Sequence, residues 1–324
     1  MKYFIKVNGQ EEKERAYFLL IVFLNLVIFS VIVTGVLIGI KGYVSDTKFT
    51  YKAVTCCGGI CSKCIFTLHT LATSLPWFCV AILFTGIGKA IYKAVQMLFM
   101  HGRFIRSLTP RFIVNCSGLK ESPFPAHLEN QWVLFENAAL RYAFTSGIWK
   151  PKIYLSTGIC SYLTAKELQS VILHEAHHIR QKAPFKLFVL QILSALNFFL
   201  PVNRHLLGRY SSLSEKAADD AAVKISGEPL ELASALLKLS RFRTLAALSP
   251  AVAFSREQGI IEERIMRILE PEAAPPCLFK TFSYLSSVFI VVVICLPLFF
   301  PLFQLIDRTD CKARVCHTDK CAQS

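Results

Sequence analysis

Two histidines of this chain are separated by three residues, and a glutamate directly follows the first of them. They are His174, Glu175 and His178, in the segment His-Glu-Ala-His-His. Residues four apart on a helix share one face, so both imidazoles can reach the same metal ion. Zinc takes ligands of this kind, and a neighbouring carboxylate can accept a proton from a water on the metal. The spacing predicts a hydrolytic site with one zinc ion and Glu175 as general base, and His177 is expected to be a bystander or to support a ligand from behind.

The segment before the histidines carries the signals of a helix that would hold them. Thr164 and Glu167 have the spacing of a capping box, which marks a helix start. Pro184 is expected to end that helix near Ala183. An apolar stripe at helical spacing runs along the side opposite the two histidines, at Leu168, Ile172, Ala176 and Ile179. The pattern predicts an amphipathic helix with one face buried.

A zinc hydrolase needs a third protein ligand beside an open coordination position. Downstream, an alanine-rich segment places Glu215 and Asp219 four residues apart. Glu215 is the candidate third ligand, and Asp219 is a candidate acceptor for a hydrogen bond from a ligand histidine. Asp220 competes with Asp219 for that role. Taken without the histidines, the same residues would be an acidic patch on an exposed helix.

Composition places this site in a membrane protein. The 324 residues carry a net charge of +14 and are 53% hydrophobic, with a mean hydropathy of +0.46. Charged residues make up 18%, against about a quarter in soluble domains. Three apolar stretches, at about 16–40, 65–88 and 281–306, are long enough to cross a bilayer. The first is too long for a signal peptide and is expected to be retained. Intrinsic disorder and a small disulfide scaffold are excluded.

The spans divide the chain into four regions. They are an N-terminal membrane region (1–88) with a Cys-rich loop (41–64), a zinc peptidase domain (89–280), a last span (281–306) and a Cys-containing tail (307–324). The predicted fold class is α+β, a multi-span helical membrane protein whose mostly helical peptidase domain carries a small β-sheet. Helices are expected at 228–239 and 256–269, supporting the catalytic domain. Between the histidines and Glu215 lies an apolar insert (187–203), which cannot be a single crossing because one metal cannot be held from both faces of a bilayer.

Lysine and arginine placement favours a peptidase domain on the cytoplasmic side of the plasma or inner membrane. Loop 41–64 and the tail then lie outside, where disulfides persist. These two segments hold seven of the twelve cysteines, and their role and pairing stay open between a tether from loop to tail and a redox or metal sensor. The seven are Cys56, Cys57, Cys61, Cys64, Cys311, Cys316 and Cys321.

Residues 136–224 resemble the integral-membrane zinc peptidases that include the BlaR/MecR-type sensor peptidases and the HtpX/CAAX-prenyl-protease group. The resemblance rests on the strand-and-turn segment 143–156, on the helix that ends in His-Glu-Ala-His-His, and on Glu-x-x-Ala-Asp after a proline-bearing apolar insert. It implies that His174, His178 and Glu215 bind zinc, that Glu175 is the general base and that Asp219 supports a ligand.

The resemblance also implies an edge strand that pairs with the extended backbone of a substrate. Here this strand is expected at Tyr142, Ala143, Phe144 and Thr145. Members of the HtpX-like group carry an arginine three residues before the glutamate ligand, but Ser212 stands there in this chain. The group that stabilises the oxyanion is therefore open, and its candidates are Arg209, Tyr210 and His205. Because 18 residues follow the last span, in place of a large sensor domain, direct β-lactam sensing is not expected.

The leading hypothesis is a membrane-embedded zinc endopeptidase. Its substrate would be a protein or peptide, with a membrane protein or a transcriptional repressor as candidates, and its other partner would be the lipid bilayer. The alternative is a regulatory membrane component with a structural or weakly catalytic zinc site and an outer cysteine-based sensor. Nucleic-acid binding is disfavoured, because the basic residues are scattered and no zinc-finger or helix-turn-helix pattern is present.

Overall fold

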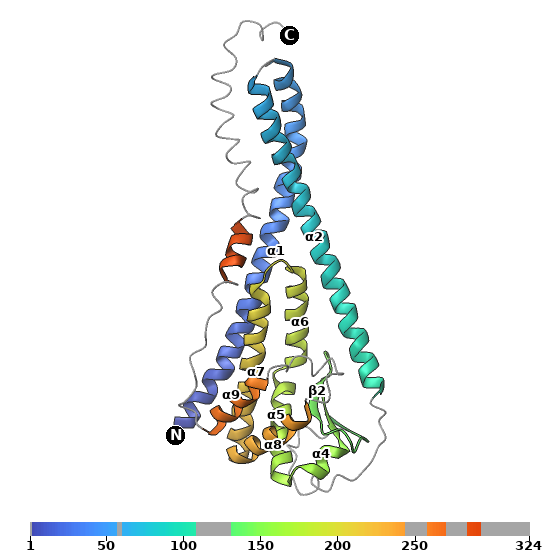
Figure 1. Cartoon of the computed structure of the whole chain (residues 1–324), viewed down its shortest axis with the longest axis vertical. Helices are drawn as coiled ribbons and strands as arrows, with labels where there is room; N and C mark the ends of the chain where they lie inside the picture. Colours follow the sequence, from blue (N-terminus) through green and yellow to red (C-terminus); the bar gives the residue numbers. More distant parts are fainter. Residues whose placement is uncertain (1, 57–59, 108–130, 244–257, 270–283, 293–324) are drawn as a thin grey trace. The chain divides into compact units, whose positions relative to one another are not determined.

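The computed structural model describes residues 2–56, 60–107, 131–243, 258–269 and 284–292. Within this part the chain is mostly helical, and it has one small sheet of three strands (Figure 1). This confirms the helical character and the small sheet that the sequence predicts.

Two compact units are built from interleaved pieces of the chain. One unit comprises residues Met1–Val22, Tyr92–Ile192 and Arg204–Phe279; it is called the peptidase unit here because it contains the residues that the sequence predicts to form a peptidase site. The other, called the span unit, comprises Phe23–Ile91, Leu193–Asn203 and Lys280–Ser324. The first 22 residues thus belong to the same unit as the histidine motif, although more than 150 residues separate them along the chain. Helices that run from one unit into the other connect them covalently.

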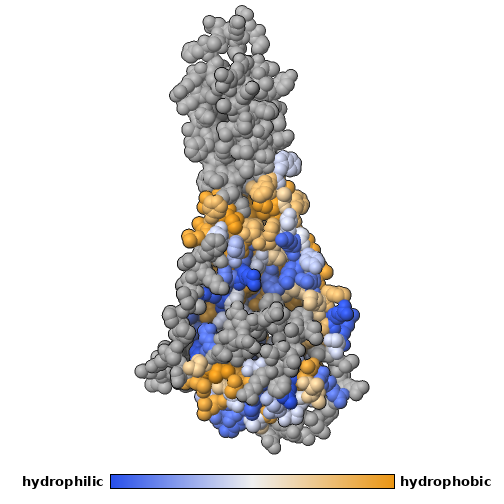
Figure 2. All heavy atoms as spheres, viewed as in Figure 1, coloured by the Kyte–Doolittle hydropathy of each residue, from blue (hydrophilic) through white to orange (hydrophobic). Residues whose placement is uncertain are grey.

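The two long helices are α1 (Lys2–Cys56) and α2 (Ile60–Ser107). Two stretches on them, Gly9–Leu37 and Trp77–Ser107, are long and apolar enough to cross a membrane. Large apolar side chains on both helices are exposed, and hydrophobic areas are visible on the described surface (Figure 2). Two candidate spans are therefore found among the described residues, where the sequence predicts three; the predicted last span, 281–306, is described only at 284–292, which is helical.

The structure corrects the prediction of a loop at residues 41–64. Helix α1 continues to Cys56 and α2 begins at Ile60, so most of this segment is helical. The physical reason is that an apolar run can end without ending the helix, since the lysines that follow it are good helix formers. The second apolar helix likewise extends well past residue 88 and ends at Ser107.

The sheet has the order β1-β3-β2, with β1 (Trp132–Phe135) parallel to β3 (Lys152–Ser156) and β2 (Ala143–Ser146) antiparallel to it. Strand β2 therefore lies at an edge. Inward-facing side chains of β1 and β3 pack against the helix that carries the histidine motif. The core that they form includes Leu134, Ile153, Leu155, Leu168 and Ile172.

A short helix, α4 (Thr157–Tyr162), follows β3 directly. Its Gly158 approaches the backbone of the segment before β2 so closely that a Cβ atom would lie 2.2 Å from the Leu140 carbonyl oxygen. Only glycine fits there. This close approach fixes the connection between the sheet and the helices that follow it.

Helix α5 (Ala165–Arg180) carries the histidines, and its start confirms the predicted capping box. Thr164 accepts a hydrogen bond from the Glu167 backbone N–H, and the Glu167 carboxylate accepts one from the Thr164 backbone N–H. The helix ends at Arg180, three residues before the predicted end. Lys182 adopts a left-handed conformation (φ 52°), and Pro184 stands in the first turn of the next helix, where proline is well tolerated.

The apolar insert is a helical hairpin. Helix α6 (Ala183–Leu196) ends in a turn, and α7 (Val202–Ser226) follows. In the span unit, the side-chain oxygen Oδ1 of Asn25, on α1, accepts hydrogen bonds from the side-chain amides of Asn197 (2.8 Å) and Asn203 (2.9 Å). Buried amides in apolar surroundings require such partners. The cluster holds the turn of the hairpin to α1.

Two helices complete the peptidase unit. They are α8 (Pro229–Arg243) and α9 (Gln258–Leu269), close to the predicted positions. Both pack with the histidine helix and α7 around a small cluster of buried apolar side chains, which are Leu173, Ala222, Leu232, Ala233 and Ile268.

Candidate active site

The histidines of α5 and the glutamate of α7 converge on one point. His174 Nε2 lies 3.6 Å from Glu215 Oε2, and His178 Nε2 lies 3.5 Å from Glu215 Oε1. Their three ligand atoms all lie within 4.8 Å of one another. Tetrahedral zinc, with bonds of about 2.0–2.1 Å, spaces its ligand atoms by about 3.3 Å. The geometry and the chemistry of these three side chains therefore fit a single zinc ion.

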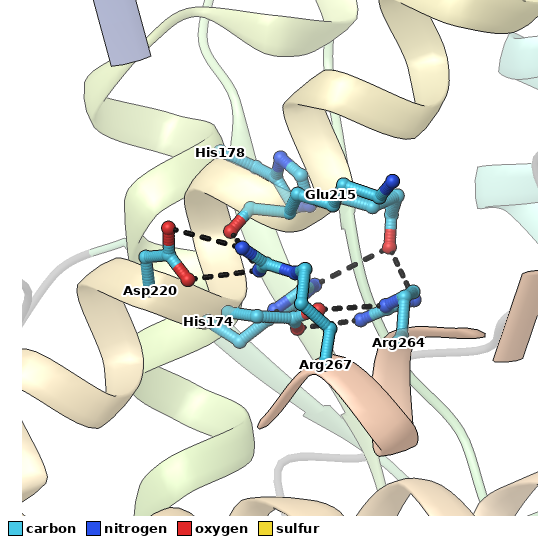
Figure 3. A network of polar contacts seen from close by, with 8 residues as sticks. His174, His178, Glu215, Asp220, Arg264 and Arg267 are labelled. Atoms are coloured by element: carbon cyan, nitrogen blue, oxygen red, sulfur yellow. Dashed lines mark hydrogen bonds and ion pairs between the residues drawn. The ribbon is translucent and has the colours of Figure 1, made fainter. Parts of the chain in front are cut away.

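Asp219 stands behind one of these ligands. Its Oδ1 lies 3.0 Å from His174 Nδ1, and its side chain is completely buried. A carboxylate in this position fixes the ring orientation and leaves Nε2 directed at the metal position. Asp220, the competing candidate, instead pairs with Arg267 at 2.8 Å (Figure 3). The structure thus brings Asp219, and not Asp220, next to a histidine of the motif.

Charges inside the site are strongly coupled. Burial alone would lower the pKa of His174, but its contacts with Asp219 and Glu215 outweigh burial and raise that pKa to about 9. Burial alone would raise the pKa of Asp219, but Arg264 and His174 hold it at about 2. Arg264 and the two histidines also keep the pKa of Glu215 well below its ordinary value, against the effect of burial. Both carboxylates are therefore anionic at neutral pH.

Arg264 is a site residue that the sequence did not reveal. It reaches from α9 to donate two hydrogen bonds of 2.7 and 2.8 Å to Asp219 and one of 2.7 Å to Glu215 (Figure 3). Only 3% of its side chain is exposed. The one available signal was its position on an amphipathic helix near Arg267, opposite a segment with two adjacent aspartates. This arginine supplies the counter-charge for the buried carboxylate of Asp219 and the partly buried carboxylate of Glu215.

Glu175 is connected to the edge strand. The Thr145 hydroxyl lies 2.9 Å from Glu175 Oε2 and 3.0 Å from the Glu175 carbonyl oxygen. Thr145 is on β2, so the predicted general base and the predicted substrate strand are joined by one side chain. This contact fixes the carboxylate relative to the strand.

A cavity of about 480 Å³ lies in front of these residues, inside the peptidase unit. Its lining includes His174, Glu175, His178 and Glu215, together with every residue from Arg141 to Ile148. The predicted edge-strand residues 142–145 therefore all line the cavity, and the strand itself spans Ala143–Ser146. Apolar side chains from the end of α2, from α6 and from α8 form the walls, among them Met97, Met100, Phe104, Leu187, Leu232 and Leu236.

The three oxyanion candidates are placed elsewhere. In the described part of the chain, the cavity lining contains none of Arg209, Tyr210 and His205. Tyr210 is completely buried, and its hydroxyl donates a hydrogen bond of 3.0 Å to Glu14. Other cationic or polar side chains do line the cavity, among them Arg264 of α9, Lys93 and His101 of α2, and Arg141.

Comparison with known proteins connects this geometry to a family. The model of the BlaR1 peptidase M56 family matches residues 66–268. The chain belongs to this family. The resemblance to membrane zinc peptidases of the BlaR and HtpX groups is thereby confirmed, and the M56 match includes the histidine motif, Glu215 and Arg264.

Two curated relatives of this M56 chain are distant. The regulatory protein BlaR1 of Bacillus licheniformis is 26% identical over 149 residues, which are 45% of this chain and 25% of BlaR1. Protease HtpX homolog 2 of Methanosarcina mazei is 22% identical over 231 residues, which are 56% of this chain and 78% of that protein. The M56 chain thus matches only a quarter of the length of BlaR1.

Proposed function

We propose that this M56-family chain is a membrane-embedded, zinc-dependent endopeptidase. The observation that carries the proposal is the convergence of His174, His178 and Glu215 beside Glu175, in a cavity that is lined by an edge strand. Bound zinc would supply the Lewis acidity that polarises a peptide carbonyl and acidifies a water. His174, His178 and Glu215 would hold it, and Asp219 and Arg264 would fix two of these ligands.

The remaining steps belong to the chain's own residues. An extended substrate would pair with the edge of β2, which carries no further strand in the described part of the chain, and this pairing would position its backbone along the cavity. Glu175, held by Thr145, would accept the proton of the attacking water and pass it to the leaving amine. Apolar walls would exclude other water and favour substrates with apolar side chains near the cleaved bond.

Substrates and location are part of the proposal. A membrane protein or a regulatory protein such as a transcriptional repressor is the expected substrate, with the peptidase unit on the cytoplasmic side. The alternative of a regulatory component with an outer sensor depends on seven cysteines whose side chains lie outside the described part of the chain. No described contact favours it, so the endopeptidase is the function we propose.

Substitution of the general base is the direct test. In the full-length, zinc-loaded protein, Glu175→Gln is expected to lower cleavage of fluorescein-labelled casein by about 10²- to 10⁴-fold, because the proton acceptor is lost. Zinc content, measured by elemental analysis, is expected to stay at the wild-type level. Glu228→Gln, at a surface ion pair with Lys166, is the matched control and should retain activity. Wild-type activity in Glu175→Gln would contradict the proposed mechanism.

A further inference from the structure

The turn between β2 and β3 presents a tryptophan to the outside. Trp149 is 77% exposed, although this ring is the largest apolar side chain available to a protein. The turn is built to hold this position: Gly147 has φ +121°, and a Cβ there would lie 2.5 Å from the Lys150 carbonyl oxygen. A turn that requires glycine and displays an indole ring indicates a surface with a partner.

Positive charge surrounds this ring. Lys150 and Lys152 flank it and are exposed, and the exposed Lys182 precedes α6. No acidic residue occurs in the sequence between Glu136 and Glu167. The partner of this surface should therefore combine apolar and anionic groups.

One contact defines the height of the tryptophan on the peptidase unit. The ring of Trp149 packs against Phe185 in the first turn of α6, with centroids 5.5 Å apart and planes inclined by 47°. The next residue, Lys186, pairs with Glu14 of α1 at 3.2 Å and lies 5.9 Å from the Phe18 ring centroid. Since adjacent helical residues differ by about 1.5 Å in height, Trp149 lies close to the level of residues 14–18 of α1.

That level is a boundary in the sequence of α1. Residues 11–15 are all charged, whereas residues 16–40 contain no charge, and the candidate span Gly9–Leu37 contains this change. In a membrane-spanning helix the change from charged to apolar residues marks the headgroup region. The β2–β3 turn is therefore placed at the same level as the expected membrane surface.

We infer that the β2–β3 turn is a membrane-interface anchor. Trp149 inserts its ring among the lipid headgroups, as tryptophan does at membrane interfaces, and Lys150 and Lys152 contact anionic lipid. The anchor also bears on the substrate, and this step rests on the proposed peptidase function. Gly147 and Ile148 line the cavity, as do Ala183, Pro184 and Leu187 of α6. The cavity therefore lies beside the lipid surface, and the substrate is a juxtamembrane segment of a membrane-bound protein.

Tryptophan fluorescence in lipid tests the anchor without any need for activity. The chain has three tryptophans, and a Trp77→Phe/Trp132→Phe variant retains only Trp149. In liposomes of phosphatidylcholine and phosphatidylglycerol, we expect bromine near the headgroup end of the acyl chains to quench its emission more than bromine near the chain end. The matched control retains only Trp132, which is half-buried in β1, and should show little quenching.

Two results would overturn the anchor. The first is Trp149 emission that is unaffected by brominated lipid and fully quenched by aqueous iodide, which means an indole in water. The second is protection from iodide without quenching by bromine, which would assign the surface to a protein partner. Trp77, exposed on the α2 span, provides the positive control for contact with lipid.

The substrate class needs a second measurement. Trp149→Ala is expected to cleave soluble casein at the wild-type rate in detergent, but to cleave a lipid-anchored peptide in liposomes several-fold more slowly. Equal losses on both substrates would assign Trp149 to folding stability and overturn the link to the substrate. If the wild-type protein cleaves neither substrate, the proposed peptidase function fails, whereas the fluorescence result still decides the anchor.

Discussion

Arg264 balances the charge of two carboxylates of the proposed site, Asp219, which is buried, and Glu215, which is partly buried. Its guanidinium group is planar and forked, so it can donate to both oxygens of Asp219 and still reach Glu215. Without it, one buried and one partly buried anion would lie beside histidines that carry only part of the opposing charge. A zinc ion would add positive charge to the same place. Arg264 is therefore most important to the chain before metal binds.

This dependence on metal gives a prediction for Arg264→Ala. In protein stripped of metal by a chelator, we expect a loss of about 3–5 kcal/mol in the free energy of unfolding, typical of breaking a buried ion pair from one side. With saturating zinc the loss should shrink, because the metal supplies counter-charge. Chemical denaturation with and without zinc measures both values.

Controls separate charge from geometry in that experiment. Arg264→Lys keeps the charge but loses the fork, and an intermediate loss is expected. Arg267→Ala removes the neighbouring pair with Asp220, which is outside the proposed metal ligands, and its effect should not depend on zinc. A zinc-independent loss in Arg264→Ala would contradict the charge-balancing role.

His174 gives a pH prediction for the metal-stripped protein. Its pKa is raised from 6.5 to about 9, so its contribution to stability is complete below pH 6.5 and is lost as the pH rises through about 9. At 1.36 kcal/mol per unit, the loss is about 3 kcal/mol. Urea unfolding between pH 7 and pH 9.5 measures it, and His174→Gln should lack this part of the dependence.

The choice of pH window matters because a neighbour acts in the opposite direction. Burial lowers the pKa of His177 to about 3, so its contribution is lost as the pH falls below 6.5. A wild-type protein whose stability rises from pH 7 to pH 9.5 relative to His174→Gln would contradict the coupling of His174 to Asp219 and Glu215.

For single residues, the spacing in the sequence correctly predicted neighbours that lie on the same helix. His174 and His178 are neighbours because a helix makes them so, and Glu215 and Asp219 are related in the same way. Arg264 follows Asp219 by 45 residues and joins it only through the packing of α9 on α7. No period in the sequence encodes such a contact. The same limit applies to Tyr210, whose bond to Glu14 crosses most of the chain.

At the scale of elements, the first turns of α1 belong to the peptidase unit. Glu14 is fully buried, pairs with Lys186 of α6 and accepts a hydrogen bond from Tyr210 of α7. Glu11, one turn earlier, pairs with Arg180 at the end of α5. The start of one candidate span is thereby joined to all three helices that carry or connect the proposed zinc ligands.

Removal of the buried carboxylate tests this connection. Glu14→Ala is expected to destabilise the protein by about 3–5 kcal/mol, because the Lys186 charge stays buried without its partner. Thermal or chemical unfolding in detergent measures the loss, and the exposed Glu12→Ala serves as its control. The double variant Glu14→Gln/Lys186→Met should recover most of the stability. A wild-type unfolding curve for Glu14→Ala would contradict the connection.

Elements with strong local signals were predictable, and those that depend on tertiary contacts were not. The capping box at Thr164 located the start of α5 because the cap is made within four residues. The predicted end of α5 was wrong by three residues, since Lys182 reverses the chain before Pro184. The prediction of a loop at 41–64 was wrong because hydropathy indicates where the lipid boundary lies, whereas a helix can continue beyond that boundary.

For the whole molecule, the shared site predicts on which side of the membrane two segments of the chain lie. Cysteines introduced at Lys182 and Lys224, in a background without native cysteines, should share one side of the membrane, because the segments that follow His178 and Glu215 must stay with one site. With the proposed orientation, an impermeant maleimide should label both only after the cells are permeabilised. Labels on opposite sides would exclude a shared zinc ion.

Labelling of both positions in intact cells would reverse the orientation while leaving the site intact. Cys160 in α4 bears on this point, because it is disulfide-bonded and disulfides are rare in a reducing cytosol. That bond weighs against the cytoplasmic side, whereas lysine and arginine placement favours it. The labelling experiment decides between the two. Composition could predict that this is a membrane protein. Neither charge nor hydropathy could predict that each unit is built from three separate pieces of the chain.

The hydroxyl of Thr145 has two acceptors within reach and one hydrogen to give. It can donate to the Glu175 carboxylate or, after rotation, to the carbonyl oxygen of the same residue, but not to both at once. A rotation about one bond therefore frees the Glu175 carboxylate from this donor, or returns the donor to it, with no movement of the backbone. Because Thr145 lies on the strand that a substrate would extend, the arrival of a peptide has a direct route to that rotation.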